Sequence, residues 1–452
     1  MTERDERPIA IVGGGFSGAL LAINLARRGA RVLLIERSQA ALAKGLAFGT
    51  RRSEHLLNVR ASNMSAFPDD AGHFLRWMGF STDAQANRFV PRLAYGQYLR
   101  ELLLKALADS GGRLGIRTGD VLTLDREAGG WRLRLSEGGD VLASGVVLAM
   151  GNLPPRLPAA LKGVPPRHAV PDPWAEGALA KIGPDDPVLL VGTGLTAVDV
   201  LLSLGNAGHR GLVLAVSRRG LRPRAHAAVG PVTRATACPE ERGAALVRAV
   251  RLRAKGVGWR QAVDDLRPHT RALWQAHDRV QQARFLRHLR AWWDVHRHRL
   301  APSVNEQLAI AEQEGRIAFR AGRLVGADAR EGHVAVHWKP RGEARDAVFR
   351  AGYVVNCTGP EGDIAQSDAP LLRHLLAEGL ARADPHRLGL DVDARCHVLD
   401  ARGQPTEGLY AIGPLTKGAT WEIVAVPDIR HQVWQLAWQL TARRAGGAAG
   451  DG

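Results

Sequence analysis

The stretch Ile9-Ala10-Ile11-Val12-Gly13-Gly14-Gly15-Phe16-Ser17-Gly18 is a short apolar run that leads directly into a glycine-rich turn. A second stretch of the same design occurs later in the chain, Val188-Leu189-Leu190-Val191-Gly192-Thr193-Gly194-Leu195-Thr196-Ala197. In such a turn the first glycine allows the tight bend, the second lets backbone N–H groups approach a pyrophosphate, and the third small residue lets the following helix pack on the strand. One such turn is a weak signal, but two predict an α/β chain with two Rossmann-like, dinucleotide-binding domains.

The residues that end the next strand of each unit distinguish the two nucleotides, because they lie beside the adenosine ribose. The first unit ends Val32-Leu33-Leu34-Ile35-Glu36-Arg37, where the Glu36 carboxylate is placed to accept both ribose hydroxyls, which predicts FAD. The second unit ends with Ser217, Arg218 and Arg219 and has no carboxylate there, which predicts NADPH through charge-assisted contacts with its 2′-phosphate. The alternatives are a solvated acid at the first strand end and a merely basic turn at the second.

Length and composition limit the class of protein. The chain has 452 residues, of which 45% are hydrophobic, enough for two or three cores. Its three cysteines, Cys238, Cys357 and Cys396, form no CxxC pair and no metal-ligand spacing, which disfavours a disulfide reductase and a metal site and favours a reducing cytoplasm. The charged start, Met1 to Pro8, and the absence of a long apolar run lead us to expect neither a signal peptide nor a membrane span.

The formal net charge of +16 raises nucleic acid as a possible partner. The basic residues are mostly arginine and are spread along the chain, as in the product of a GC-rich coding sequence, and anionic cofactors account for part of the charge. We therefore expect no nucleic-acid partner.

The order of glycine turn, antiparallel meander and apolar strand ending in glycine occurs twice, with meanders expected over Arg113–Leu148 and Arg316–Tyr353. This order predicts a structural duplication of one dinucleotide-binding plan. A closing buried strand is expected at Leu409–Gly413 and a final helix at Ile429–Arg443. The expected domains are an FAD-binding domain in two parts (1–157 and 354–445), a proline-rich linker (158–185), an NADPH-binding domain (186–353) with a helical insertion at about 239–314, and a tail (446–452).

With these motifs the chain resembles the two-dinucleotide-binding flavoproteins, and more narrowly a bacterial family of uncharacterised FAD/NAD(P)-binding proteins related to the flavin-containing and N-hydroxylating monooxygenases. The resemblance spans nearly the whole chain. It rests on His55-Leu56-Leu57-Asn58-Val59, Gly192-Thr193-Gly194-Leu195-Thr196, Ser217-Arg218-Arg219-Gly220-Leu221, Asn356-Cys357-Thr358-Gly359-Pro360, Ile412-Gly413-Pro414-Leu415-Thr416, Trp421-Glu422 and Ala425-Val426-Pro427.

The resemblance implies a set of cofactor-binding residues around the two turns and at the strand ends that face them. Two departures are visible: Pro414 follows Gly413 where many relatives have an aspartate for the ribityl chain, and Leu161, Gly163 and His168 only approximate the linker signature of flavin-containing monooxygenases. The implied cofactor-binding residues are Gly13, Gly15, Phe16, Ser17, Gly18, Glu36, Arg37, Asn58, Val121, Gly151, Gly192, Gly194, Leu195, Thr196, Ser217, Arg218, Arg219, Gly359, Gly413 and Trp421.

Few side chains are needed for chemistry, because a flavin itself carries the redox reaction. The stretch His55–Phe67 resembles a flavin-adjacent loop in which an asparagine amide binds nicotinamide and flavin oxygens; Asn58 is the first candidate and Asn63 the second, and a loop-capping asparagine is the alternative. Trp421 is a candidate wall of the flavin ring or a plain core residue. The segment Trp292–Arg299 is a candidate cover for the cofactors, although a solvated helix face is the simpler expectation.

Three functions remain open at this point. The first is a single-component FAD monooxygenase that uses NADPH and oxygen to form a flavin hydroperoxide and oxygenates a small-molecule nucleophile, by N-hydroxylation or a similar reaction. The second is an NADPH-dependent FAD reductase or dehydrogenase that inserts no oxygen. The third, suggested only by the basic insertion, is a redox-sensing or nucleic-acid-associated protein that binds FAD without turnover. The Asn58 loop favours the first, and the sequence names neither the substrate nor the oligomeric state.

Overall fold

The computed structural model describes residues 7–228, 230 and 236–447, and the chain divides into two compact units. Unit 1 comprises Met1–Ser53, Val59–Leu153 and Glu361–Gly452, and unit 2 comprises Glu54–Asn58 and Pro154–Pro360. The start of the chain, for which no signal peptide is expected, and most of the expected tail at 446–452 lie outside the described residues.

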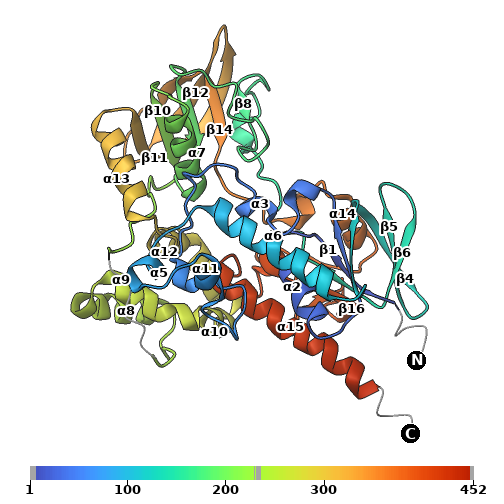
Figure 1. The fold of residues 1–452 in the computed structure, drawn as a ribbon. Coiled ribbons are helices and arrows are strands. Elements are labelled where there is room, and N and C mark those ends of the chain that lie inside the picture. Colours follow the sequence, from blue (N-terminus) through green and yellow to red (C-terminus); the bar gives the residue numbers. More distant parts are fainter. Residues whose placement is uncertain (1–6, 229, 231–235, 448–452) are drawn as a thin grey trace. The chain divides into compact units, whose positions relative to one another are not determined.

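Unit 1 contains a six-stranded sheet in the order β15-β16-β7-β1-β2-β3. All strands are parallel except β15 at the edge. Every residue of the first strand is buried, as expected for a parallel strand covered on both faces, and helices α6 and α15 both pack against α2 (Figure 1). The elements are β1 (Ile9–Val12), β2 (Val32–Glu36), β3 (Leu114–Thr118), β7 (Gly145–Leu148), β15 (His397–Leu399), β16 (Pro405–Ala411), α2 (Phe16–Ala26), α6 (Arg92–Asp109) and α15 (Val426–Gly447).

The meander expected over Arg113–Leu148 is antiparallel only in its middle. Strands β4 (Val121–Glu127), β5 (Gly130–Leu135) and β6 (Asp140–Ala143) form a separate three-stranded antiparallel sheet. Its two ends were predicted wrongly, because β3 and β7 belong to the parallel sheet. A four-residue apolar run such as β7 has no alternation that would show on which sheet it lies.

Unit 2 repeats the plan of unit 1. Its sheet runs β13-β12-β11-β10-β9-β14-β8, and β9, β10, β11 and β14 take the relative places of β1, β2, β3 and β7. The long β11 pairs in parallel with β10 and then antiparallel with β12, so the predicted duplication and second meander are both present. The elements are β8 (Ala169–Val170), β9 (Val188–Val191), α7 (Leu195–Asn206), β10 (Val213–Ser217), β11 (Ile317–Arg330), β12 (His333–Pro340), β13 (Ala347–Ala351) and β14 (Tyr353–Asn356).

The expected linker, 158–185, lies in unit 2, where its β8 pairs with β14. Residues 354–360, expected at the start of the second FAD-binding part, also lie in unit 2 because β14 pairs with β9.

The predicted insertion consists mainly of helices joined by short non-helical stretches (Figure 1). The solvated helix face expected for Trp292–Arg299 is wrong for two of its arginines, because Arg297 and Arg299 are buried. Arg299 donates a hydrogen bond of 2.9 Å to the Asp264 carboxylate. The helices of the insertion are α8 (Gly243–Val257), α9 (Trp259–Leu266), α10 (Thr270–Gln275), α11 (Arg279–His288), α12 (Arg290–Arg297) and α13 (Pro302–Gln313). Unit 1 adds the short helices α3 (Gly45–Phe48), α4 (His73–Trp77), α5 (Asp83–Ala86) and α14 (Pro370–Ala377).

Among the described residues, none of the helices has the length and apolar character that crossing a bilayer requires. Over the same part of the chain, we find no group of three or more His, Cys, Asp or Glu side chains that could hold a metal ion.

Candidate cofactor-binding sites

The first glycine turn has the geometry that a pyrophosphate needs. Gly13 has a φ of 103°, and a Cβ atom there would lie 2.5 Å from the carbonyl oxygen of Ala149. A Cβ atom on Gly18 would overlap the carbonyl oxygen of Gly13, so the close approach of helix and strand requires glycine. Gly15 is the N-cap of α2, and within the described chain no side chain caps this helix. Its first-turn N–H groups are therefore a fitting anion site.

Phe16 and Ser17, in the first turn of α2, are both buried. At the end of β2, the Glu36 carboxylate accepts the N–H of Gly14 at 2.7 Å and that of Ser38 at 3.0 Å. Each carboxylate oxygen keeps further acceptor capacity, so these bonds orient Glu36 without preventing it from accepting ribose hydroxyls. The next residue, Arg37, is exposed.

The second glycine turn has the same geometry. Gly192 has a φ of 120°, and a Cβ atom there would overlap the carbonyl oxygen of Cys357. Gly194 is the N-cap of α7, a Cβ atom there would meet open space, and no described side chain caps this helix. Leu195 and Thr196, in its first turn, are half-buried. Residues 192–196 thus form a second fitting anion site.

The predicted 2′-phosphate residues lie together at the end of β10, but they differ in how they are held. The Ser217 hydroxyl accepts the N–H of Gly220 at 3.0 Å and lies 2.8 Å from the hydroxyl of Thr193, a partner that the sequence reasoning missed. Arg219 donates a hydrogen bond of 3.2 Å to the main-chain oxygen of Arg287 in the helical insertion. Arg218 is exposed and is the more accessible of the two guanidinium groups.

The late glycine turn, η6 (Gly413–Thr416), is closed by a ring of hydrogen bonds in unit 1. Gly413 donates its N–H to Gln432 Oε1 at 2.8 Å, Gln432 Nε2 donates to Thr416 Oγ1 at 3.1 Å, and Thr416 Oγ1 donates to the Gly413 carbonyl at 2.9 Å. Gln432 lies on α15, and no motif in the sequence singled it out. This ring holds the turn that contains Pro414.

The remaining predicted residues lie as follows. Gly413 has a φ of 69°, and a Cβ atom there would lie 2.5 Å from Ser17 Oγ. Trp421 is buried, with Lys417 Nζ 5.0 Å from its ring centre. Val121 is buried in the hydrophobic core of unit 1. Gly151 and Gly359 have φ values of 71° and 87°. A Cβ atom added to either residue would meet no other atom of the described chain within 4 Å.

The stretch His55–Phe67, treated as one loop in the sequence, is divided between the two units. Asn58 falls in unit 2 and Asn63 in unit 1. The main-chain oxygen of Asn58 accepts a hydrogen bond from His226 Nε2 at 3.0 Å. In unit 1, Arg430 on α15 donates to the main-chain oxygen of Ser65 at 2.9 Å.

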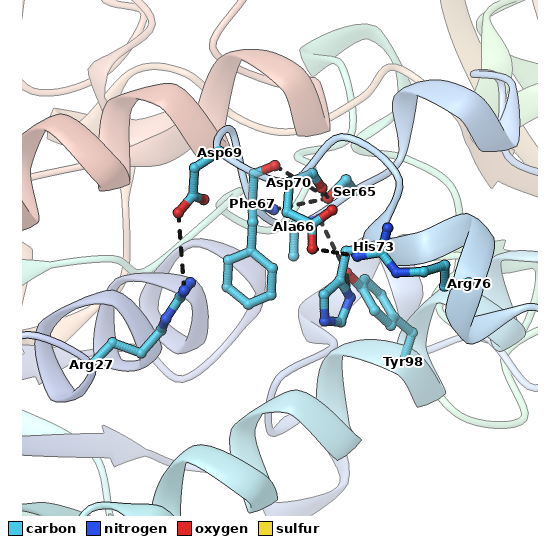
Figure 2. A network of polar contacts seen from close by, with 9 residues as sticks. All are labelled: Arg27, Ser65, Ala66, Phe67, Asp69, Asp70, His73, Arg76 and Tyr98. Atoms are coloured by element: carbon cyan, nitrogen blue, oxygen red, sulfur yellow. Dashed lines mark hydrogen bonds and ion pairs between the residues drawn. The ribbon is translucent and has the colours of Figure 1, made fainter.

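Figure 2 shows how the unit 1 part of this stretch is held. The Tyr98 hydroxyl lies 2.9 Å from His73 Nδ1 and accepts the N–H of Ala66 at 3.3 Å, and the Ser65 hydroxyl donates 2.6 Å to the main-chain oxygen of Asp70. Burial raises the pKa of Tyr98 to about 12 and lowers the pKa of His73. Both shifts favour a Tyr98 hydroxyl that donates to a neutral His73 ring.

Comparisons with known proteins agree with this geometry. Residues 10–153 match a family model described as FAD-NAD(P)-binding, and residues 351–423 match an FAD binding domain. A search of curated proteins finds no match.

Among solved structures, the chain is similar to L-lysine 6-monooxygenase from Pseudomonas syringae (TM-score 0.66, 16% identity, 97% of this chain and 99% of that chain covered). It is similar to the ornithine N-hydroxylase of Kutzneria sp. 744 (TM-score 0.64, 16% identity, 97% of this chain and 99% of that chain covered). It is also similar to a bacillithiol disulfide reductase from Staphylococcus aureus (TM-score 0.58, 12% identity, 97% of this chain and 99% of that chain covered). The chain therefore has the fold of the two-dinucleotide-binding flavoproteins, with sequence of the FAD- and NAD(P)-binding type in residues 10–153 and of the FAD-binding type in 351–423.

Proposed function

We propose that the protein is an FAD-dependent, NADPH-using monooxygenase that oxygenates a small-molecule nucleophile, with an amine nitrogen as the first candidate. The observation that carries the proposal is the pair of uncapped helix N-termini, each behind a glycine turn, with a carboxylate at one ribose position and arginines at the other. The similarity in fold to lysine and ornithine N-hydroxylating enzymes supports an amine as substrate.

In this proposal each unit has one nucleotide to hold. The α2 N-terminus and Glu36 bind FAD, and the α7 N-terminus with Ser217 and Arg218 binds NADPH. Asn58 supplies an amide to the bound cofactors, and Trp421 is a candidate neighbour of the flavin ring. FAD, when bound, supplies the transfer of reducing equivalents from NADPH to oxygen; the protein binds, orients and excludes water.

A reductase that inserts no oxygen is the second candidate, because the same fold occurs in a bacillithiol disulfide reductase. Reduction of a disulfide is not proposed, since the cysteines are far apart in sequence, and burial raises the pKa of the Cys357 thiol. The acceptor would then be a quinone, another small molecule or a protein. The three cysteines form no CxxC pair, which supports our further proposal of a reducing, cytoplasmic location.

The deciding experiment measures NADPH oxidation, oxygen uptake and peroxide release by the FAD-loaded protein, with lysine, ornithine and other amines as candidate substrates. A monooxygenase consumes one oxygen per NADPH, and in the presence of its substrate it incorporates one atom of labelled ¹⁸O₂ into the product. NADPH oxidation that proceeds equally well without oxygen, once a quinone is supplied, contradicts the proposal and favours the reductase.

A further inference from the structure

The chain leaves unit 1 after Ser53, contributes only residues 54–58 to unit 2, and returns to unit 1 at Val59. We call residues 54–58 the crossing segment. Its sequence, Glu-His-Leu-Leu-Asn, contains two buried side chains, His55 and Leu57, each 4% exposed. No helix or strand element covers these five residues, and contacts from His55 and Asn58 join them to other parts of unit 2.

His55 attaches the crossing segment to α7, the helix that follows the second glycine turn. Its Nε2 atom lies 2.9 Å from the hydroxyl of Ser203 and 3.1 Å from the main-chain oxygen of Asp199. A protonated Nε2 donates to either oxygen, and an unprotonated Nε2 accepts from the hydroxyl, so the ring keeps a partner on α7 in both tautomers. Trp174, also in unit 2, packs edge-on against the His55 ring, with 5.8 Å between ring centres.

A second histidine holds the other end of the segment. His226 Nε2 lies 3.0 Å from the main-chain oxygen of Asn58. A carbonyl oxygen only accepts, so His226 Nε2 carries the proton and donates. The crossing segment is thus held at two points, through the side chain of His55, which contacts α7, and through the side chain of His226, which contacts Asn58. Both partners are distant from the segment in the sequence.

We propose that the crossing segment is a structural part of the nicotinamide-binding unit and that His55 is a positioning residue for Asn58. The inference rests on the proposed function in one respect, the role of the Asn58 amide at the cofactors. His55 touches no cofactor in this proposal; it acts by keeping Asn58 with α7 and therefore with the nucleotide that α7 binds. Because His55 and Ser203 are both buried, removal of the imidazole leaves a polar partner without its bond, and local opening of the segment becomes easier.

The first test needs no enzyme activity. Arg51 and Arg52 are exposed and precede the crossing segment, so trypsin reports on opening of this region in the full-length, FAD-loaded protein. We expect His55→Ala to accelerate cleavage after Arg51 and Arg52 by about 5- to 30-fold, the factor that corresponds to losing one buried hydrogen bond. His55→Gln, which keeps a polar nitrogen close to the position of Nε2, should cleave at nearly the wild-type rate, as should the control His288→Ala on the exposed face of α11.

The second test asks whether His55 acts through Asn58. The readout is the fraction of NADPH electrons released as peroxide during turnover. Both His55→Ala and Asn58→Ala should raise this fraction, and the double variant should release no more peroxide than Asn58→Ala alone, because two residues that serve one contact are not additive. Flavin reduction by NADPH should remain, which separates positioning from loss of the fold.

Ser203→Ala and His226→Ala probe the same segment if His55→Ala does not fold, and each should accelerate the same tryptic cleavage. Unchanged cleavage in these variants overturns the assignment of the segment to unit 2. Faster cleavage with additive peroxide release in the double variant overturns the positioning role. If the wild type consumes no oxygen, the proposed monooxygenase fails, while the cleavage result still decides whether His55 holds the segment.

Discussion

We propose that single residues decide which nucleotide each unit accepts. Backbone sterics require glycine at Gly13, Gly18 and Gly192. In the proposed function, Glu36 supplies hydrogen-bond acceptors at one ribose, and Ser217 and the two arginines supply contacts at the other. Arg219 is bonded to Arg287, and Arg218 is exposed, so the two neighbouring arginines are not equivalent.

Arg218→Ala should weaken NADPH binding selectively. Loss of one charge-assisted contact to a phosphate costs about 1.5–3 kcal/mol, so the KM for NADPH should rise ~10-fold or more. The KM for NADH should stay nearly unchanged, because NADH lacks the 2′-phosphate. Initial-rate kinetics with both nucleotides measure this, with Arg251→Ala, an exposed arginine on α8, as the control. Equal use of NADPH and NADH by the wild type would count against the NADPH assignment.

His73 should make the protein less stable in mild acid. Burial is the main cause that lowers the pKa of His73, and the Asp70 carboxylate opposes it. The unfolded histidine titrates near pH ~6.5, so below that pH the unfolded state binds more protons, and stability falls until the lowered folded pKa is passed.

Replacing His73 with glutamine removes this proton linkage. The free energy of unfolding of His73→Gln should therefore change less than that of the wild type between about pH 7 and 5. Urea unfolding at several pH values measures the difference, and parallel curves for the two proteins would refute the assignment.

Among the elements, the two strand–turn–helix units carry the proposed nucleotide sites. Both helices begin at a glycine that no described side chain caps, and both sit behind fully buried parallel strands. The late turn η6 differs, because a residue from α15, Gln432, completes its hydrogen bonds.

A matched pair of substitutions tests the assignment of one nucleotide to each turn. Gly15→Val should block approach of the pyrophosphate at α2 and yield colourless protein that takes up little added FAD. Gly194→Val should leave the protein yellow but abolish reduction of its flavin by NADPH. A Cβ atom at Gly194 meets open space and its φ is −84°, so this variant should fold normally. Flavin absorbance and anaerobic reduction by NADPH are the measurements; loss of FAD from both variants would contradict the assignment.

At the scale of the whole molecule, one plan of strands is used twice, and each copy carries additions. Unit 1 adds the three-stranded sheet β4–β6, and unit 2 adds the helical insertion, in which the buried Arg299 pairs with the half-buried Asp264. In the proposed function each unit binds one nucleotide, so each ligand should stabilise the folded chain separately.

NADP⁺ should therefore raise the melting temperature of the FAD-loaded protein. At a concentration 100 times its Kd, a ligand that binds only the folded state adds about 2.7 kcal/mol. NAD⁺ at the same concentration should add much less. Calorimetry of the wild type and of Arg218→Ala is the measurement, and the NADP⁺ shift should shrink in the variant. Identical shifts with NAD⁺ and NADP⁺ would contradict the expected preference.

The sequence by itself determined the features that depend on short stretches of backbone: the two glycine turns with their helices, the duplicated strand plan, the helical insertion and the final helix. These follow from local sterics and from apolar patterns a few residues long. The roles of the candidate cofactor residues remain predictions.

Tertiary structure alone decided the features that join distant residues. The ends of the first meander became strands of the parallel sheet, Arg297 and Arg299 were buried, and the stretch His55–Phe67 was divided between two units. Gln432 closes a turn 19 positions away, and His226 bonds Asn58 across 168 positions. No local pattern records such partners, because a hydrogen bond between distant residues depends on the packing of the elements that carry them.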